Sequence, residues 1–184
     1  MNDIPEVLAK KSIEEAKGLV IDSIAETMDL YGITRSAGVL YGTMYFSDEM
    51  TLDEMREELQ MSKPSMSTSV KKLQDLNVVK KTFHKGRRKY GFVAEKDFFK
   101  FFTSFFPKKW EREVKVNLAA IEEAQNELQD VIRNQQLDES LKDEARTLYQ
   151  QLEDSKPYYD WLNRLTEFVE SGEIFKYIPI KNKE

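Results

Sequence analysis

The chain contains no cysteine and a single histidine, His84, among its 184 residues. The lack of cysteine excludes thiolate catalysis and disulfide chemistry, makes a structural zinc site implausible and fits the reducing cytoplasm. With one histidine, no Ser/His/Asp set can be assembled away from residue 84, and HExxH, CxxC, P-loop and GxGxxG patterns are all missing. We therefore expect no enzyme, no catalytic residue, no metal site and no cofactor.

Long apolar runs are also missing. No stretch approaches the ~20 residues that a membrane-spanning helix needs, so we expect no membrane partner. Charged residues make up 33% of the chain, and apolar residues recur between them at helical spacing. This pattern favours long helices with solvated faces over disorder.

The first third of the sequence predicts two helices. One is expected over residues 6–31, with Gly32 ending it. The next, SAGVLYGTMYF, is apolar almost all round, which is typical of a helix packed between other elements. Its Gly38 and Gly42 lie four residues apart and would permit close contact with a neighbouring helix.

The C-terminal half predicts further long helices. One is capped by Asp97, and Pro107 is expected to break or kink it before a continuation to about residue 135. Another begins at Asp138, and Pro157 is expected to interrupt it before it continues to Gly172. The tail IFKYIPI is expected to form a short strand or an extended arm.

Residues 62–90 are a basic segment in an acidic chain. They hold nine Lys and Arg against one carboxylate, Asp75, whereas the whole chain has a formal charge of −5. Thr51 and Glu54 make a capping box before the segment, and Ser62 can cap a second helix. VVKKTFHKG, the turn KGRRK and KYGFVA then predict a β-hairpin. This order predicts a winged helix-turn-helix, a mainly α fold with a small β-hairpin wing (α+β).

The helix from Ser62 to Leu76 has the features that a DNA recognition helix needs. Met66, Val70 and Leu73 form an apolar back, while small hydroxyls and lysines occupy the opposite side. Hydroxyls can contact base edges or phosphates, and cations neutralise phosphates. The predicted DNA contacts are Lys63, Ser65, Thr68, Ser69, Lys71 and Lys72 on the helix and Lys85, Arg87, Arg88 and Lys89 on the wing.

Three other interpretations of the basic segment stay open. A solvated basic face on an ordinary helical domain would carry the same charges but would not explain the order of caps, turn and hairpin. A sequence-tolerant architectural protein would bind DNA without operator preference. A winged-helix protein-interaction module would not bind DNA even at low salt.

Four strings carry a resemblance to a known family: MDLYGITRSAGVLYGTMYF, MTLDEMREELQMSKPSMSTSVKKLQDLNVVKKTFHKG, YYDWLNRL and SGEIFKYIP. They resemble the GbsR family of MarR-like winged-helix regulators, which controls glycine betaine synthesis and choline or betaine uptake in bacteria. The resemblance implies a cytoplasmic, dimeric repressor whose binding to a double-stranded DNA operator responds to choline. A regulator with a different small effector and a ligand-independent DNA-binding protein are the alternatives.

The long amphipathic helices suggest how a dimer would form. One winged helix reads half a site, and two copies must lie about 34–36 Å apart to meet successive major grooves. Residues 1–31 and 108–172 have more apolar surface than one small core requires, although an intramolecular bundle would also use it. The predicted domains are an N-terminal helix contributing to dimerisation (1–33), the winged helix-turn-helix (34–96) and a helical dimerisation and effector domain (97–184).

Aromatic residues gather in three groups, around residues 31–46, 98–110 and 158–161. Aromatic side chains at helical spacing are usually core. A quaternary ammonium, however, is held by aromatic faces through cation–π attraction, and the resemblance implies choline or a related quaternary ammonium as effector. We predict an aromatic cage between the winged domain and the helical lobe, lined by Tyr41, Tyr45, Phe98, Phe102 and Trp110.

Overall fold

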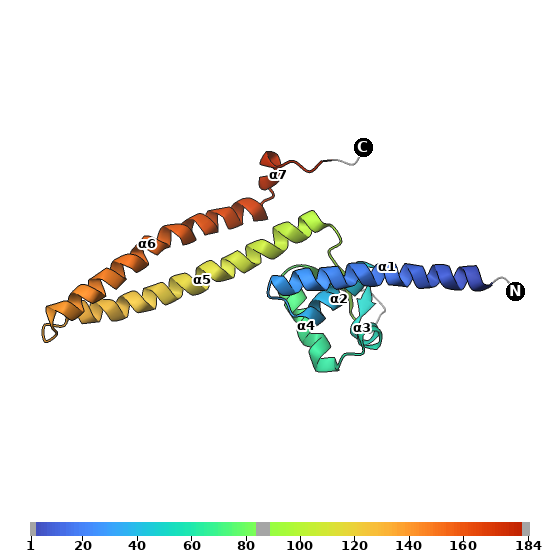
Figure 1. Cartoon of the computed structure of the whole chain (residues 1–184), viewed down its shortest axis with the longest axis horizontal. Helices are drawn as coiled ribbons and strands as arrows, with labels where there is room; N and C mark the ends of the chain where they lie inside the picture. The colour runs from blue at the N-terminus through green and yellow to red at the C-terminus, as the bar shows by residue number, and fades with distance from the viewer. Residues whose placement is uncertain (1–2, 84–88, 182–184) are drawn as a thin grey trace. The chain divides into compact units, whose positions relative to one another are not determined.

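The computed structural model describes residues 3–83 and 89–181. Two compact units divide the chain, Met1–Phe102 and Thr103–Glu184, here called the first and second units. The mainly helical content with a small antiparallel sheet confirms the predicted fold class. The described elements are α1 (Asp3–Leu30), α2 (Arg35–Tyr45), β1 (Met50–Thr51), α3 (Leu52–Leu59), α4 (Lys63–Asp75), β2 (Val79–Thr82), β3 (Gly91–Ala94), α5 (Phe98–Arg133), α6 (Glu139–Glu170) and α7 (Ile174–Tyr177) (Figure 1).

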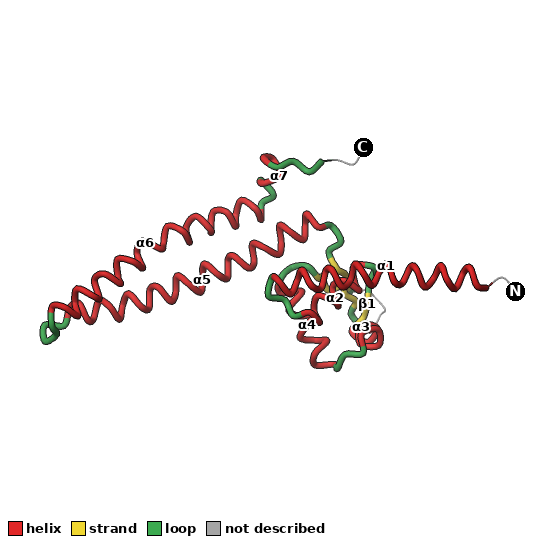
Figure 2. Tube along the Cα trace, viewed as in Figure 1, coloured by secondary structure: helices red, strands yellow, loops and turns green. Residues whose placement is uncertain are grey.

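The sheet of the first unit has three antiparallel strands in the order β1-β3-β2. Strands are yellow in Figure 2, where β1 is labelled. β2 and β3 are the two strands of the predicted wing, and Lys81 of β2 pairs with Phe92 of β3. On the other edge of β3, Met50 of β1 pairs with the same Phe92. β1 was not predicted, because two residues are too few to show the alternation that marks a strand.

Close packing joins α1 to α2, as the two glycines predicted. A Cβ atom at Gly38 would lie 2.7 Å from the Cα atom of Ala25, and one at Gly42 would lie 3.1 Å from the Cα atom of Ile21. Ala25 and Leu40 are completely buried. The absence of side chains at both glycines therefore lets the backbones of the two helices approach each other.

Local sequence signals account for the turn between α3 and α4. The Oγ1 atom of Thr51 accepts a hydrogen bond from the backbone N–H of Glu54 at 3.3 Å, and the Thr51 N–H donates to Glu54 Oε2 at 2.7 Å. This is the predicted capping box. After α3, Gln60 adopts a positive φ of 51°, which ends the helix, and Ser62 occupies the N-cap of α4.

Pro107 and Pro157 each lie inside a continuous helix. The predicted break at Pro107 is wrong, because α5 runs from Phe98 to Arg133 without interruption, and the interruption predicted at Pro157 is wrong because α6 continues through it. The kink expected at Pro107 as the alternative stays a prediction. A proline in a helix interior costs about 3 kcal/mol. Burial of Pro107 together with Phe105 offsets that cost with packing. The predicted strand or extended arm is also wrong for residues 174–177, which form the short helix α7.

The second unit is built on the antiparallel pair α5 and α6 (Figure 1). Val114 and Ile121 on α5 are buried, as is Leu162 on α6. A polar contact also joins the helices, since the buried amide of Gln125 donates to Glu153 Oε1 at 2.8 Å. Within the described residues, no helix is long and apolar enough to span a membrane.

Candidate nucleic-acid interface and aromatic pocket

The N-terminus of α4 is built by its own residues. The Ser62 side chain accepts from the backbone N–H of Ser65 at 3.4 Å and donates to the Ser65 hydroxyl at 3.0 Å. Pro64 lies in the first turn, where its missing N–H removes no intrahelical bond. Met66 and Leu73 are completely buried on the inner face. The cap and the apolar back together fix which residues of α4 face outward.

The outward face of α4 carries four of the ten predicted DNA contacts. Lys63, Ser65, Thr68 and Lys71 are exposed. Hydroxyls and ammonium groups on one helix face provide both base-edge hydrogen bonds and phosphate neutralisation. The first part of the predicted site is thus gathered on one surface, here called the α4 face.

Two predicted residues on α4 differ from the others. Ser69 is only 8% exposed, so its predicted place on the outer side is wrong. It directly precedes the buried Val70 and follows Met66 by three positions, which places it at the edge of the packed stripe. Lys72 is half-buried, and its Nζ atom donates to the backbone carbonyl of Gly32 at 3.3 Å.

The wing presents lysines on strand β2. Lys80 and Lys81 are exposed, and the Lys81 ammonium lies 3.4 Å from the centroid of the Tyr90 ring. Such a contact over an aromatic face is a cation–π interaction. Neither lysine was among the predicted contacts. Both belong to the basic segment of residues 62–90, and that membership could have indicated them. Three predicted wing contacts lie outside the described residues: Lys85, Arg87 and Arg88.

Lys89, the fourth predicted wing contact, is exposed and paired. Its Nζ atom donates to Asp53 Oδ2 of α3 at 2.6 Å. The hydrogen bond from Lys89, and then its charge, lower the pKa of the Asp53 carboxyl, with smaller contributions from Arg56 and Lys63. The same hydrogen bond raises the pKa of Lys89. The sequence did not single out Asp53, because the pair joins residues 36 positions apart.

An aromatic pocket of about 180 Å³ lies within the first unit. Its walls come from the C-terminal part of α1 with Tyr31, from α2 and from the start of α5, and no charged side chain is among the lining residues. Tyr41 and Phe101 form one wall, with ring centroids 5.3 Å apart. The lining residues are Ser23, Ile24, Thr27, Met28, Tyr31, Tyr41, Phe98 and Phe101.

Two of the five predicted cage residues, Tyr41 and Phe98, line this pocket. Tyr45 stacks on Phe98 with ring centroids 5.3 Å apart but is not a lining residue. Phe102 belongs to the first unit and does not line the pocket either. Trp110 belongs to the second unit, where its ring centroid lies 5.6 Å from that of Phe106.

Tyr31 and Phe101 line the pocket but were not predicted to do so. Phe101 lies three residues after Phe98, and helical spacing alone would have placed both on one side of α5. Tyr31 follows the end of α1, and no local pattern indicates which residues that end contacts.

The hydroxyl of Tyr41 is fixed by the backbone. It donates to the carbonyl oxygen of Glu95 at 2.5 Å, and the Tyr41 side chain is 1% exposed. Burial, with a smaller contribution from the Glu95 charge, raises the pKa of Tyr41 well above its ordinary value. Tyr41 is therefore a neutral donor at physiological pH and holds the pocket wall in a defined orientation.

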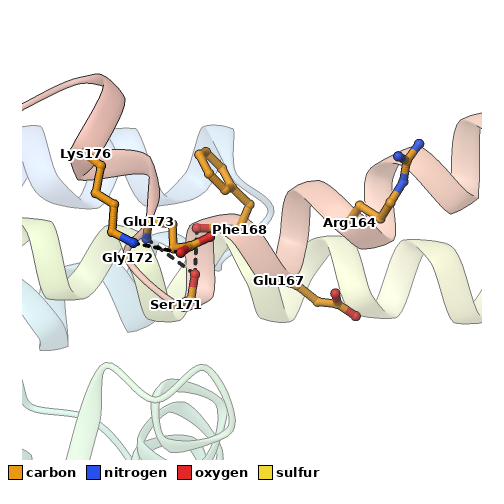
Figure 3. Close-up of a pocket in the computed structure, with 7 residues that line it drawn as sticks. All are labelled: Arg164, Glu167, Phe168, Ser171, Gly172, Glu173 and Lys176. Atoms are coloured by element: carbon orange, nitrogen blue, oxygen red, sulfur yellow. Dashed lines mark hydrogen bonds and ion pairs between the residues drawn. The ribbon is translucent and has the colours of Figure 1, made fainter.

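A separate hollow of about 640 Å³ lies at the C-terminal end of α6 (Figure 3). Its polar groups pair locally. The Lys176 ammonium donates to Glu173 Oε1 at 2.8 Å, and the Ser171 hydroxyl donates to the Phe168 carbonyl at 3.1 Å. None of the residues predicted to bind DNA or effector lines this hollow.

Comparison with known proteins decides the family. Residues 98–176 match the family model described as the GbsR family transcriptional regulator, C-terminal helical hairpin. The chain is 73% identical over 183 residues to the HTH-type transcriptional repressor GbsR of Bacillus subtilis (strain 168), with 100% of each chain covered. This chain belongs to the GbsR family. The resemblance carried by the four sequence strings is thereby confirmed.

Two further relatives of this GbsR-family chain also come from Bacillus subtilis (strain 168). It is 36% identical over 173 residues to the HTH-type transcriptional repressor OpcR, with 94% of this chain and 93% of the relative covered. It is 35% identical over 168 residues to the putative HTH-type transcriptional regulator YvaV, with 91% of this chain and 94% of the relative covered. Relatives of this kind are regulators rather than enzymes, in agreement with the expectation from the missing catalytic motifs.

A solved structure supports the fold of this GbsR-family chain. It is described as the crystal structure of a transcriptional regulator, and it matches with a TM-score of 0.51 at 15% sequence identity. The match covers 83% of this chain and 99% of the other. At this identity the likeness concerns the fold.

Proposed function

We propose that this GbsR-family chain is a cytoplasmic DNA-binding repressor of genes for glycine betaine synthesis or choline uptake. It binds operator DNA as a homodimer, and choline in the aromatic pocket relieves repression. The observation that carries the proposal is the α4 face, with its exposed hydroxyls and lysines, of which Lys63 lines one pocket together with Lys81 and Lys89 of the wing. Family membership supports the regulatory role.

DNA binding follows from charge and shape. α4 offers its side chains on a helix narrow enough for a major groove, and the wing supplies cations for adjacent phosphates. Each phosphate neutralised releases counterions, so log affinity should fall linearly with log salt concentration. The test is a gel shift with the promoter nearest the gene, against random duplex, at increasing salt. Affinity indifferent to salt would contradict the proposal, and equal affinity for random duplex would indicate an architectural protein instead.

Dimerisation is supported by apolar side chains on α1 that the chain itself leaves uncovered. Val7, Leu8, Ile13 and Leu19 are each at least 55% exposed, and a second copy would remove this surface from water. We expect a dimer in sedimentation experiments at micromolar concentration. Leu8→Glu should weaken it, whereas Lys11→Glu, on the same exposed helix, should not. A monomeric wild-type chain would contradict this part of the proposal.

Choline is proposed as effector because of the chemistry of the aromatic pocket. A quaternary ammonium cannot donate a conventional N–H hydrogen bond, so aromatic faces hold it through cation–π attraction, from about 0.5 to 2 kcal/mol or more per desolvated contact. Four rings line this pocket, those of Tyr31, Tyr41, Phe98 and Phe101. Ser23 and Thr27 also line the pocket, and the Thr27 hydroxyl, which donates to the Ser23 backbone carbonyl at 2.9 Å, can still accept a hydrogen bond from the alcohol end of choline.

The effector site is tested by calorimetric titration of choline, betaine and a primary amine analogue. Phe98→Leu removes one lining ring, and Phe99→Leu is the matched control, because Phe99 is a half-exposed neighbour that does not line the pocket. We expect choline affinity to fall severalfold in Phe98→Leu and to stay unchanged in Phe99→Leu. Equal effects of the two substitutions would place the ligand elsewhere. If none of the three compounds produced heat on titration, the proposal that choline is the effector would be wrong.

Relief of repression requires that choline prefer one state of the protein. A ligand shifts an equilibrium only by its differential affinity for the two states, and about 1.4 kcal/mol of preference changes operator affinity tenfold. The gel shift repeated with saturating choline measures this coupling directly. Choline that binds without changing operator affinity would refute the regulatory step while leaving the binding site intact.

A further inference from the structure

A second pocket, beside the wing, has a volume of about 330 Å³. It brings a carboxylate together with three lysines: its lining includes Asp53 of α3, Lys63 of α4, and Lys81, Lys89 and Tyr90 of the wing. We call it the wing pocket. Its mixture of several cations with one anion sets it apart from the uniformly cationic surface that the sequence predicted.

The lysines of the wing pocket are held in different ways. Lys89 donates to the Asp53 carboxylate at 2.6 Å, so its charge is neutralised locally. Lys81 instead lies 3.4 Å from the centroid of the Tyr90 ring, and within the described part of the chain no carboxylate pairs with it. The aromatic face orients the Lys81 ammonium without cancelling its charge.

The ion pair of Asp53 and Lys89 contributes little to the fold. Both side chains are exposed, by 45% and 68%, and water screens such pairs strongly. Its main effect is to fix where the Lys89 ammonium points and what charge it shows to a ligand. An anion that displaces the carboxylate would meet Lys89 and Lys81 in one pocket.

We propose that the wing pocket binds one phosphodiester group of the DNA backbone and that Asp53 is a displaceable counter-ion for Lys89. This inference rests on the proposed DNA binding. In the protein without DNA, Asp53 holds Lys89 in the pocket. When DNA binds, the phosphate takes the place of the carboxylate at the Lys89 ammonium, while Lys63 and Lys81 complete the cationic wall. Asp53 thus lowers operator affinity by occupying a cation that DNA uses.

The test measures operator affinity by fluorescence anisotropy over a range of salt concentrations. Asp53→Asn keeps the side-chain shape and removes the charge, and we expect severalfold tighter binding at low salt. Glu58→Gln is the matched control, since it removes one exposed carboxylate of the same helix that is not a lining residue. Lys81→Gln should weaken binding and make the salt slope shallower by about 0.9, the value for one phosphate contact.

A double-substitution cycle tests whether Asp53 lowers DNA affinity by pairing with Lys89 or by repelling the DNA through its own charge. If Asp53 acts by occupying Lys89, Asp53→Asn should have little effect when Lys89 is already Gln. Equal tightening in that background, or equal tightening by Glu58→Gln, would overturn the inference. Weaker binding by Asp53→Asn in a chain that unfolds at the wild-type temperature would also overturn it, since Asp53 would then position Lys89 productively. A wild-type chain without salt-dependent DNA binding would overturn the proposed function itself.

Discussion

Gly38→Ala tests the close contact between α1 and α2. A Cβ atom at this position would lie 2.7 Å from Ala25 Cα, 3.1 Å from the Ala25 carbonyl oxygen and 3.2 Å from Ala25 Cβ. Backbone atoms cannot rotate away as a flexible side chain can. The two helices must therefore separate or slide to admit the methyl group, and this loosens the packing around the buried Leu40.

Gly18→Ala is the matched substitution within α1, where a Cβ atom would have nothing within 4 Å. Replacing glycine by alanine in a helix interior gains about 0.5–1 kcal/mol, and this gain applies at both positions. Overpacking a close contact costs about 1–3 kcal/mol, and this cost applies at Gly38 alone. The difference between the free energies of unfolding of the two variants should therefore be about 1–3 kcal/mol, with Gly38→Ala the less stable.

The measurement is urea unfolding followed by circular dichroism at 222 nm, with all variants at one protein concentration because dimerisation would shift the midpoint. Gly18→Ala should unfold at higher urea than the wild type, and Gly38→Ala at lower urea. Equal stabilisation by both substitutions would refute the close contact, since it would show that the methyl group at residue 38 meets open space.

Two further predictions concern hydrogen bonds in the first unit. Thr51→Ala removes the capping box and should lower the free energy of unfolding by about 1 kcal/mol, whereas Thr51→Ser should keep most of it; thermal unfolding distinguishes the two. Tyr41→Phe leaves the Glu95 carbonyl without its hydroxyl donor and should cost about 1 kcal/mol at neutral pH. Because burial raises the pKa of Tyr41, the stability that this residue contributes is present below its unfolded pKa and is lost as pH rises above about 10. Tyr41→Phe should therefore lose less stability than the wild type between neutral pH and pH 11 in urea titrations, and parallel pH profiles would show that Tyr41 is not held neutral by the fold.

The parts of the fold that the sequence predicted are those fixed by neighbours in the chain. The capping box of Thr51 and Glu54 spans four residues, and the cap at Ser62 spans four more. The apolar stripe of α4 follows from helical spacing alone, and so does most of its exposed face. Such features depend on dihedral preferences and short hydrogen bonds, which a sequence pattern expresses directly.

The failures arose where packing between distant residues decides the outcome. Ser69 was placed outside by residue type, yet it is buried at the edge of the α4 stripe. Pro107 remains inside a helix because its own burial compensates for the missing hydrogen bond. At Pro107 an intrinsic preference of about 3 kcal/mol was overridden by tertiary contacts, which no local pattern encodes. At Ser69 the helical spacing from Met66 already indicated the edge of the packed stripe, and residue type was given too much weight.

In the aromatic pocket, too, some residues were predictable from the local sequence and others depend on contacts between distant segments. Tyr41 and Phe98 were expected in it from residue type and grouping, and both line it. Tyr31 was missed because its role depends on how α1 ends against other elements, and Asp53 was missed because it meets Lys89 only after the wing has folded back to α3.

The helix α1 is anchored at one end only. Ala25 and Met28 are buried, whereas every residue over positions 5–16 is exposed. A helical segment of about twelve residues is marginal in water by itself. Backbone amides should therefore exchange with deuterium fastest over the first turns of α1 and slowest near Ala25. If a second copy covers the first turns, raising the protein concentration should slow their exchange and leave the rate near Ala25 unchanged.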